Sequence, residues 1–225
     1  MTDDPASAWD AEYARGRYLD EPPVPFVRDV LATAHRYGHT TGLYVGCGNG
    51  RNFLPLLAGG LDLTGLDVSR TALDQLAARA PGARLHHGDL ASLPPGGYPL
   101  VVGIQVFQHG DAATTRAHVR AAADRVVPGG LLCVRVNAVG TDVWPAHEVL
   151  ERGDGLTVRY TAGPKRGLAV HFFAADELRA AVGDGFREVL AMRRDDTTRA
   201  VAEHGRWCQW EAIWQRKALT CRNTP

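Results

Sequence analysis

The sequence predicts a doubly wound α/β fold, in which a mostly parallel sheet carries helices on both faces. A chain of 225 residues with 45% hydrophobic content is long enough to bury one substantial core. Short apolar runs alternate with helical segments, and a glycine-rich turn follows the first such run. Short strands separated by helices form parallel pairs, because each helix carries the chain back across the sheet.

The first part of the chain supplies most of this alternation. Apolar residues recur at helical spacing from Pro23 to Tyr37, and Gly38 ends the helix they predict. Ser69 is the expected N-cap of a later helix. Strands are predicted at 41–45, 61–67, 83–89, 100–107 and 131–139, and further helices at 52–60, 69–80 and 112–127.

The alternation stops after the fifth predicted strand. Residues from Gly140 to Gly167 lack regular periodicity, and a long irregular stretch in one domain is typical of a functional lid or a disordered loop. A helix at 174–182 and two strands at 186–194 and 205–217 are predicted beyond it, although the tryptophans of the last segment also suit a helix face. We expect one domain, made of a flap and helix (1–39), a core (40–138), an irregular lid and acceptor region (139–172) and a C-terminal helix with strands (173–225).

Composition narrows the classes of function. The 25 basic and 25 acidic residues cancel, and no basic block is present, so nucleic acid is not an expected partner. The scattered cysteines show no CxxC pair, the N-terminus has no apolar signal core, and no run is long enough to span a bilayer. We expect a cytoplasmic protein with no membrane partner, as a monomer or homodimer. No HxxxH or HxH pair occurs, so no metal site is predicted.

A glycine loop in "GLYVGCGNGRN" follows the first predicted strand. Gly46, Gly48 and Gly50 allow a sharp turn that brings a ligand against the next helix. A dinucleotide fingerprint has its third glycine one residue later, where this chain has Arg51, so the spacing disfavours NAD or FAD.

Polar side chains stand at the ends of three further predicted strands. Asp67 ends the second strand, Asp89 follows the third and Gln105 lies near the end of the fourth. Ligands of open α/β sheets bind at the carboxyl ends of parallel strands. The alternatives remain that Asp67 caps a helix, that Asp89 is a turn residue and that Gln105 is a satisfied polar group.

Five segments together resemble the class I S-adenosylmethionine-dependent methyltransferases. They are "VGCGNGRN", "GLDVS", "HHGDLASLP", "LVVGIQVFQHG" and "VVPGGLLCVRV", in that order, and "GCGNGRN" is similar to the tellurite-resistance-type branch. The resemblance covers residues 40–138. It implies a Rossmann-like seven-stranded sheet whose last strand is antiparallel, which makes the tryptophan-rich segment a strand.

The resemblance also implies a cofactor and the residues that hold it. The cofactor is S-adenosyl-L-methionine. Its methionine part would contact Gly46, Cys47, Gly48 and Gln105, and its ribose and adenine would contact Asp67, Val68, Asp89 and Leu90.

The position two residues before the first glycine departs from the family pattern. Members usually have an acid there, whereas this chain has Tyr44, whose phenol is neutral at pH 7. Asp10 or Glu12 is a candidate replacement. The N-terminal segment resembles a flap over the methionine carboxylate, although a solvated arm is the alternative. The flap residues would be Tyr13, Arg15 and Tyr18.

Methyl transfer from a sulfonium requires alignment, exclusion of water and, for some acceptors, a base. His109 is the candidate base, against the alternative that it is structural. Trp144, Tyr160 and His171 are candidate contacts for a small-molecule acceptor, such as a natural-product intermediate. The alternative function is a binding or regulatory protein that retains the fold. A nicotinamide dehydrogenase conflicts with the glycine spacing.

Overall fold

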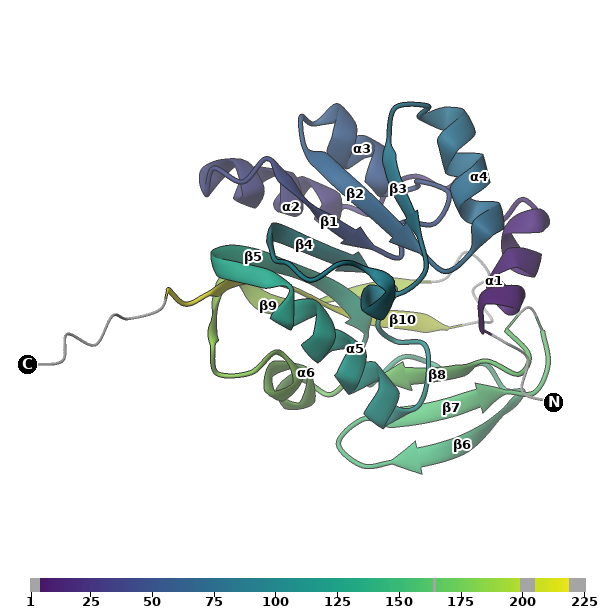
Figure 1. The fold of residues 1–225 in the computed structure, drawn as a ribbon. Helices are drawn as coiled ribbons and strands as arrows, with labels where there is room; N and C mark the ends of the chain where they lie inside the picture. The colour runs from purple at the N-terminus through teal and green to yellow at the C-terminus, as the bar shows by residue number, and fades with distance from the viewer. Residues whose placement is uncertain (1–4, 164, 199–204, 219–225) are drawn as a thin grey trace, which may run out of the picture.

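The computed structural model describes residues 5–163, 165–198 and 205–218. Its centre is a seven-stranded sheet, and a smaller antiparallel sheet lies beside it (Figure 1). The order of the large sheet is β3-β2-β1-β4-β5-β10-β9. Its strands are β1 (Thr41–Val45), β2 (Asp62–Asp67), β3 (Arg84–His87), β4 (Tyr98–Ile104), β5 (Val126–Asn137), β9 (Phe186–Thr198) and β10 (Arg206–Arg216).

The predicted sheet is confirmed in topology and in strand direction. The first five strands pair in parallel, and β10 runs antiparallel to both β5 and β9. The tryptophan-rich segment is therefore a strand. The helix that follows β2 begins after Ser69, whose hydroxyl accepts the N–H of Ala72, as the sequence predicts.

Helices cover both faces of the large sheet (Figure 1). One face packs against α2 (Phe26–Arg36), α3 (Phe53–Ala58) and α4 (Arg70–Arg79) through one hydrophobic cluster. The other packs against α5 (Ala112–Asp124) and α6 (Ala175–Val182) through a second cluster. A layer on each side buries the apolar residues of the central strands, which read as nearly continuous hydrophobic runs.

The prediction that residues 140–167 are irregular is wrong in one respect. It contains a three-stranded antiparallel sheet, made of β6 (His147–Arg152), β7 (Leu156–Tyr160) and β8 (Ala169–Phe172). Residues 140–146, 161–163 and 165–168 remain without a strand or a helix. The first strand of this sheet is exposed along most of its length, so it lacks the apolar alternation that identifies a strand in a sequence.

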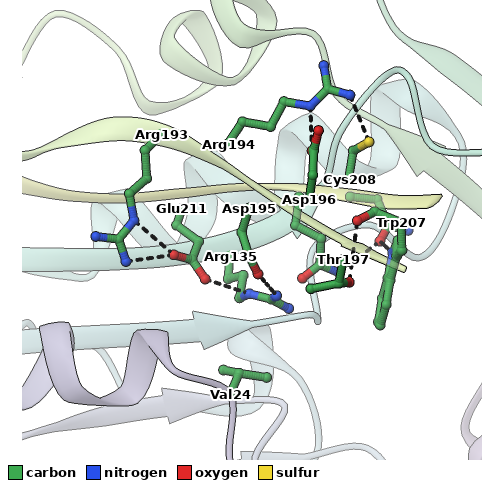
Figure 2. A network of polar contacts seen from close by, with 12 residues as sticks. Val24, Arg135, Arg193, Arg194, Asp195, Asp196, Thr197, Trp207, Cys208 and Glu211 are labelled. Atoms are coloured by element: carbon green, nitrogen blue, oxygen red, sulfur yellow. Dashed lines mark hydrogen bonds and ion pairs between the residues drawn. The ribbon is translucent and has the colours of Figure 1, made fainter. Parts of the chain in front are cut away.

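A buried ion-pair network joins β5 to the two C-terminal strands (Figure 2). The Arg135 side chain, 4% exposed, donates to Glu211 at 2.8 Å and to Asp195 at 2.5 Å. Glu211 also accepts from Arg193 at 2.9 Å, and Arg193 reaches Asp29 of α2. Two arginines thus share one carboxylate that is 3% exposed. Charges at this depth are tolerated because each has a partner.

We predict that Glu211→Ala lowers the free energy of unfolding by about 3 kcal/mol or more, because it leaves Arg135 and Arg193 without their shared carboxylate. The matched control is Glu148→Ala. Glu148 pairs with Arg159 on the small sheet at 2.7 Å, but its side chain is 50% exposed. The control is expected to cost less than about 1 kcal/mol. Denaturant unfolding of both variants checks the prediction, and equal losses would contradict it.

Candidate functional site

A cavity of about 1170 Å³ opens at the carboxyl ends of the parallel strands. Its walls come from the loops after β1 to β4, the end of β5, the N-terminal segment, the small sheet and the start of β10. Single-ligand pockets measure roughly 300 to 1,000 Å³. The cavity therefore has room for two molecules side by side, at the edge of the sheet where ligands of this fold bind.

The glycine loop is held by a hydrogen bond to β2. Gly46 and Gly48 have φ angles of 68° and 53°, in the left-handed region that favours glycine. The Gly48 N–H donates to Asp67 Oδ2 at 2.7 Å, and the Ser69 N–H donates to Asp67 Oδ1 at 2.9 Å. A Cβ at Gly48 would meet the hydroxyl of Tyr13. The bare backbone is therefore required both by the turn and by its neighbour.

Asp67 lines the cavity and is buried. Burial raises the pKa of its carboxyl, and the N–H donors at Ser69 and Gly48 oppose that shift. Because each carboxylate oxygen has two lone pairs, each can accept one further hydrogen bond. The alternative that Asp67 caps a helix is wrong, because the N-cap of α4 is Ser69, and Asp67 accepts the N–H of that cap residue while it lines the cavity.

The predicted residues of the next two strands also lie in the cavity wall. Asp89 Oδ1 accepts the N–H of Ser92 at 2.9 Å, so it caps the short helix Leu90–Ser92 as a turn residue. Gln105 has a φ of 60°, a conformation that costs energy for a residue other than glycine. Its N–H donates to the Arg135 carbonyl at 2.7 Å. The strained backbone directs the chain after β4 toward the cavity. Cys47, Val68 and Leu90 are further members of the wall.

Tyr44 is buried at the base of the cavity. Its ring packs edge to face against Phe53, with centroids 5.8 Å apart. Burial raises the pKa of the phenol, so it is neutral at physiological pH. The two suggested replacements for the missing acid do not line the cavity. Asp10 accepts from Ser69 Oγ at 2.6 Å, and Glu12 pairs with Arg15 and Arg17.

The N-terminal segment contributes aromatic rings to the cavity. Its helix α1 (Pro5–Ala14) packs on α4, and Tyr13 and Tyr18 line the cavity with ring centroids 5.7 Å apart. The prediction of Arg15 at this site is wrong, because its side chain is 62% exposed and lies outside the lining. Arg17 occupies the wall in its place.

His109 stands in the cavity wall, with its ring against Trp9 at 4.7 Å between centroids. Its Nδ1 is buried and has no hydrogen-bond partner in the described part of the chain. Burial lowers the pKa of His109 to about 3, and the positive charge of Lys165 acts in the same direction. The imidazole is therefore neutral and a weak base, which favours contact with a ligand over uptake of its proton.

The three candidate acceptor contacts separate into two groups. Trp144 and Tyr160 line the cavity, with ring centroids 5.3 Å apart. The prediction for His171 is wrong, because it borders a different cavity of about 300 Å³. His171 is buried between Thr157, at 2.8 Å from Nδ1, and Glu177, at 3.0 Å from Nε2. These partners belong to other elements, β7 and α6, so the local pattern gave no indication of them.

The prediction from the sequence did not include several residues of the wall, chief among them Trp9, Asn137 and Trp207. Asn137 ends β5, and the rule that ligands bind at strand ends would have found it. Trp9 and Trp207 enter through the packing of the two ends of the chain on the core, which no local pattern reports.

Two kinds of feature are absent from the residues that the structure describes. Within residues 5–163, 165–198 and 205–218, no three His, Cys, Asp or Glu side chains gather as metal ligands. In the same residues no helix is both long and apolar enough to cross a bilayer.

Comparisons with known proteins agree with this geometry. Residues 43–130 match the family model of the methyltransferase domain. These residues therefore resemble a methyltransferase domain. The matched residues run from β1 to the start of β5, and they include the glycine loop, Asp67 and Asp89. A comparison with curated proteins finds no match.

Solved structures extend the likeness of the methyltransferase domain to nearly the whole chain. Magnesium protoporphyrin IX methyltransferase from Synechocystis PCC 6803, with bound SAM, is 17% identical, with a TM-score of 0.65 over 94% of this chain and 95% of that chain. The 1,6-didemethyltoxoflavin-N1-methyltransferase of Burkholderia thailandensis is 18% identical, with a TM-score of 0.65 over 94% and 87%. An amino pentose methyltransferase from Micromonospora echinaspora, with bound SAM, is 18% identical, with a TM-score of 0.61 over 92% and 97%.

These likenesses confirm the predicted fold, that of the class I methyltransferases. The narrower resemblance to the tellurite-resistance-type branch stays a prediction.

We predict that His109 makes stability depend on pH. The unfolded chain binds a proton at this histidine below about pH 6.5, whereas the folded protein does so only near pH 3. Stability is therefore lost as the pH falls through this window. Between pH 7 and pH 5 the expected contribution is roughly 2 kcal/mol. Denaturant unfolding at both pH values should show a smaller loss for His109→Gln than for the parent, and equal losses would contradict the prediction.

Proposed function

We propose that the protein is an S-adenosylmethionine-dependent methyltransferase that acts on a small molecule. The observation that carries this proposal is one cavity in which the glycine loop and Asp67 form one end, and aromatic side chains form the other. Its volume suits a cofactor together with an acceptor. The residues that resemble a methyltransferase domain span the strands that build the first end.

S-adenosylmethionine is the cofactor with which relatives of this fold are crystallised. The residues at the glycine end fit it. Asp67 retains lone pairs that would accept from the two ribose hydroxyls, and Val68, Asp89 and Leu90, which line the cavity, would contact the adenine. Gly46, Cys47, Gly48 and Gln105 would hold the methionine part, with Tyr13 and Tyr18 above them. When bound, this cofactor supplies a methyl group already activated by a sulfonium charge.

The protein's contribution to the reaction is alignment and shielding. Rings from the N-terminal helix, from the segment before the small sheet and from β7, namely Trp9, Trp144 and Tyr160, close the acceptor end against water. His109 stays neutral there and offers a hydrogen bond to the acceptor. A nucleophile that is already deprotonated, or that loses its proton to water, suits such a site.

The acceptor is a small molecule in this proposal. Neighbours of this fold are named for methylation of an amino pentose, of 1,6-didemethyltoxoflavin and of magnesium protoporphyrin IX. The aromatic wall favours an acceptor that contains a ring, and a natural-product intermediate fits that description.

Calorimetric titration tests the proposal with three ligands: S-adenosylmethionine, S-adenosylhomocysteine and NAD. Micromolar binding of the first two, without binding of NAD, is the expected result. Binding of NAD in their place, or of none of the three, would contradict the proposed cofactor.

We predict that Asp67→Ala weakens binding of S-adenosylhomocysteine at least tenfold, because it removes the carboxylate that holds the loop and faces the ribose. The control is Asp62→Ala, at the exposed start of the same strand, where the carboxylate pairs only with exposed Arg84. Its affinity should match that of the parent. Tyr44→Phe removes one neutral hydroxyl and should weaken binding only severalfold. Calorimetry measures all three. Loss of binding in Tyr44→Phe alone would show that Tyr44, and not Asp67, makes the main contact with the cofactor.

A further inference from the structure

Asn137 lies where the last parallel strand enters the cavity. It ends β5, is 3% exposed and forms part of the cavity wall. Its carbonyl accepts the N–H of Phe173 at 2.9 Å, and its backbone is in register with Gln209 on β10. Arg135, which stands two positions earlier on the same face of the strand, anchors β5 through the buried network (Figure 2). The position of Asn137 is therefore fixed by several contacts.

Two donors set the orientation of the Asn137 amide. Trp207 Nε1 donates to Asn137 Oδ1 at 2.9 Å, and Gln209 Nε2 donates to the same oxygen at 3.2 Å. An indole nitrogen can only donate, so the atom that faces it must be the oxygen. The amide nitrogen then points the other way. It donates to no group in the described part of the chain, which leaves its two N–H groups for whatever occupies the cavity.

This orientation is maintained at a cost. Gln209 is fully buried, and its Oε1 has no hydrogen-bond partner among the described residues. A buried acceptor without a partner destabilises a protein, and an apolar residue of similar size would avoid that penalty. Gln209 therefore contributes less to stability than to holding the Asn137 oxygen. Polar groups that violate the packing rules in this way concentrate at functional sites.

The surroundings of Asn137 indicate what it binds. Trp207 contacts Asn137, and the wall of the same cavity also holds Trp144, Tyr160, Phe172, the neutral His109 and the charged Lys165. The acids that follow parallel strands, Asp67 and Asp89, belong to β2 and β3, which β1 and β4 separate from β5 in the sheet. An aromatic wall with one outward pair of N–H donors suits a flat ring that carries an acceptor atom, and the positive charge of Lys165 in the same wall disfavours a cationic ring.

We propose that Asn137 selects the methyl acceptor by donating a hydrogen bond to an oxygen or ring nitrogen of a flat, uncharged compound. Trp207 and Gln209 are positioning residues that turn the donor toward the cavity. This inference rests on the proposed function, because it assigns the aromatic end of the cavity to the acceptor. It adds one requirement to the methyl acceptor, namely a hydrogen-bond acceptor atom that faces β5, which the aromatic wall alone does not impose.

The test compares isoquinoline with naphthalene, which differ by one acceptor nitrogen in place of a C–H group. Both are titrated at pH 8 into protein saturated with S-adenosylhomocysteine, and the ratio of their dissociation constants is determined. The variant is Asn137→Asp, which keeps an oxygen for Trp207 and Gln209 but replaces the N–H donors. The pair 1-indanone and indane repeats the comparison without a basic nitrogen.

In Asn137→Asp, the preference for the acceptor-bearing probe should fall about five- to tenfold relative to the parent, as expected for one lost hydrogen bond. Gln209→Leu should reduce the preference by a smaller factor, because Trp207 still holds the oxygen. The control Gln215→Leu changes an amide at the far end of β10, which contacts Gly129. It should leave the ratio unchanged. A purely structural role would weaken both probes together.

An unchanged ratio in Asn137→Asp would overturn the proposal, as would failure of either probe pair to bind the parent protein. Asn137→Leu provides a second variant if the aspartate disturbs folding, and it should give the same loss of preference. The prior titration with S-adenosylhomocysteine separates the two proposals. Absence of that binding counts against the methyltransferase function, whereas normal binding with no discrimination counts only against the role of Asn137.

Discussion

The hydrogen bond from the Gly48 N–H to Asp67 is the contact on which the candidate site depends. It joins the left-handed loop after β1 to the end of β2. Asp67 also accepts from the Ser69 N–H, and the Ser69 hydroxyl donates to Asp10 of the N-terminal helix. One buried carboxylate thus connects the loop, the start of α4 and, through Ser69, the segment that covers the cavity. Its raised pKa reflects the cost of holding charge at this depth.

A second set of contacts fixes the opposite end of the cavity. Arg135 and Glu211 hold β5 against β10, and Asn137 and Trp207 extend from the same two strands into the cavity wall. The Arg135 carbonyl accepts the N–H of Gln105, whose backbone is strained. The buried network therefore supports both the turn after β4 and the Asn137 amide. A buried ion pair gives little net stability against an apolar alternative, so its value here is in fixed geometry.

Local signals determined how much could be predicted from the sequence. The strand at 41–45 is matched residue for residue, and Ser69 caps its helix, because apolar runs and capping residues act over a few positions. The small sheet was missed because β6 is almost wholly exposed and pairs through contacts made only in the folded chain. His171 was misplaced for the same reason, since Thr157 and Glu177 enclose it from other elements.

The two ends of the cavity differ in the charged side chains that they carry. Asp67 and Asp89 place carboxylates at one end of the cavity, whereas Tyr44 puts a neutral phenol in the wall there. Beyond the loop the wall is aromatic, and His109 is too weak a base to retain a proton at neutral pH. In the proposed reaction, the positive charge of the sulfonium would therefore meet an acceptor end without a carboxylate in the part of the wall formed by His109, Trp144 and Lys165. Transfer of the methyl group would leave a neutral thioether and would pass the positive charge to the methylated acceptor, or cancel it where the nucleophile is an anion, and a dry environment favours such dispersal of charge. The acceptor end thus acts by position and exclusion of water, and it needs no ionised side chain.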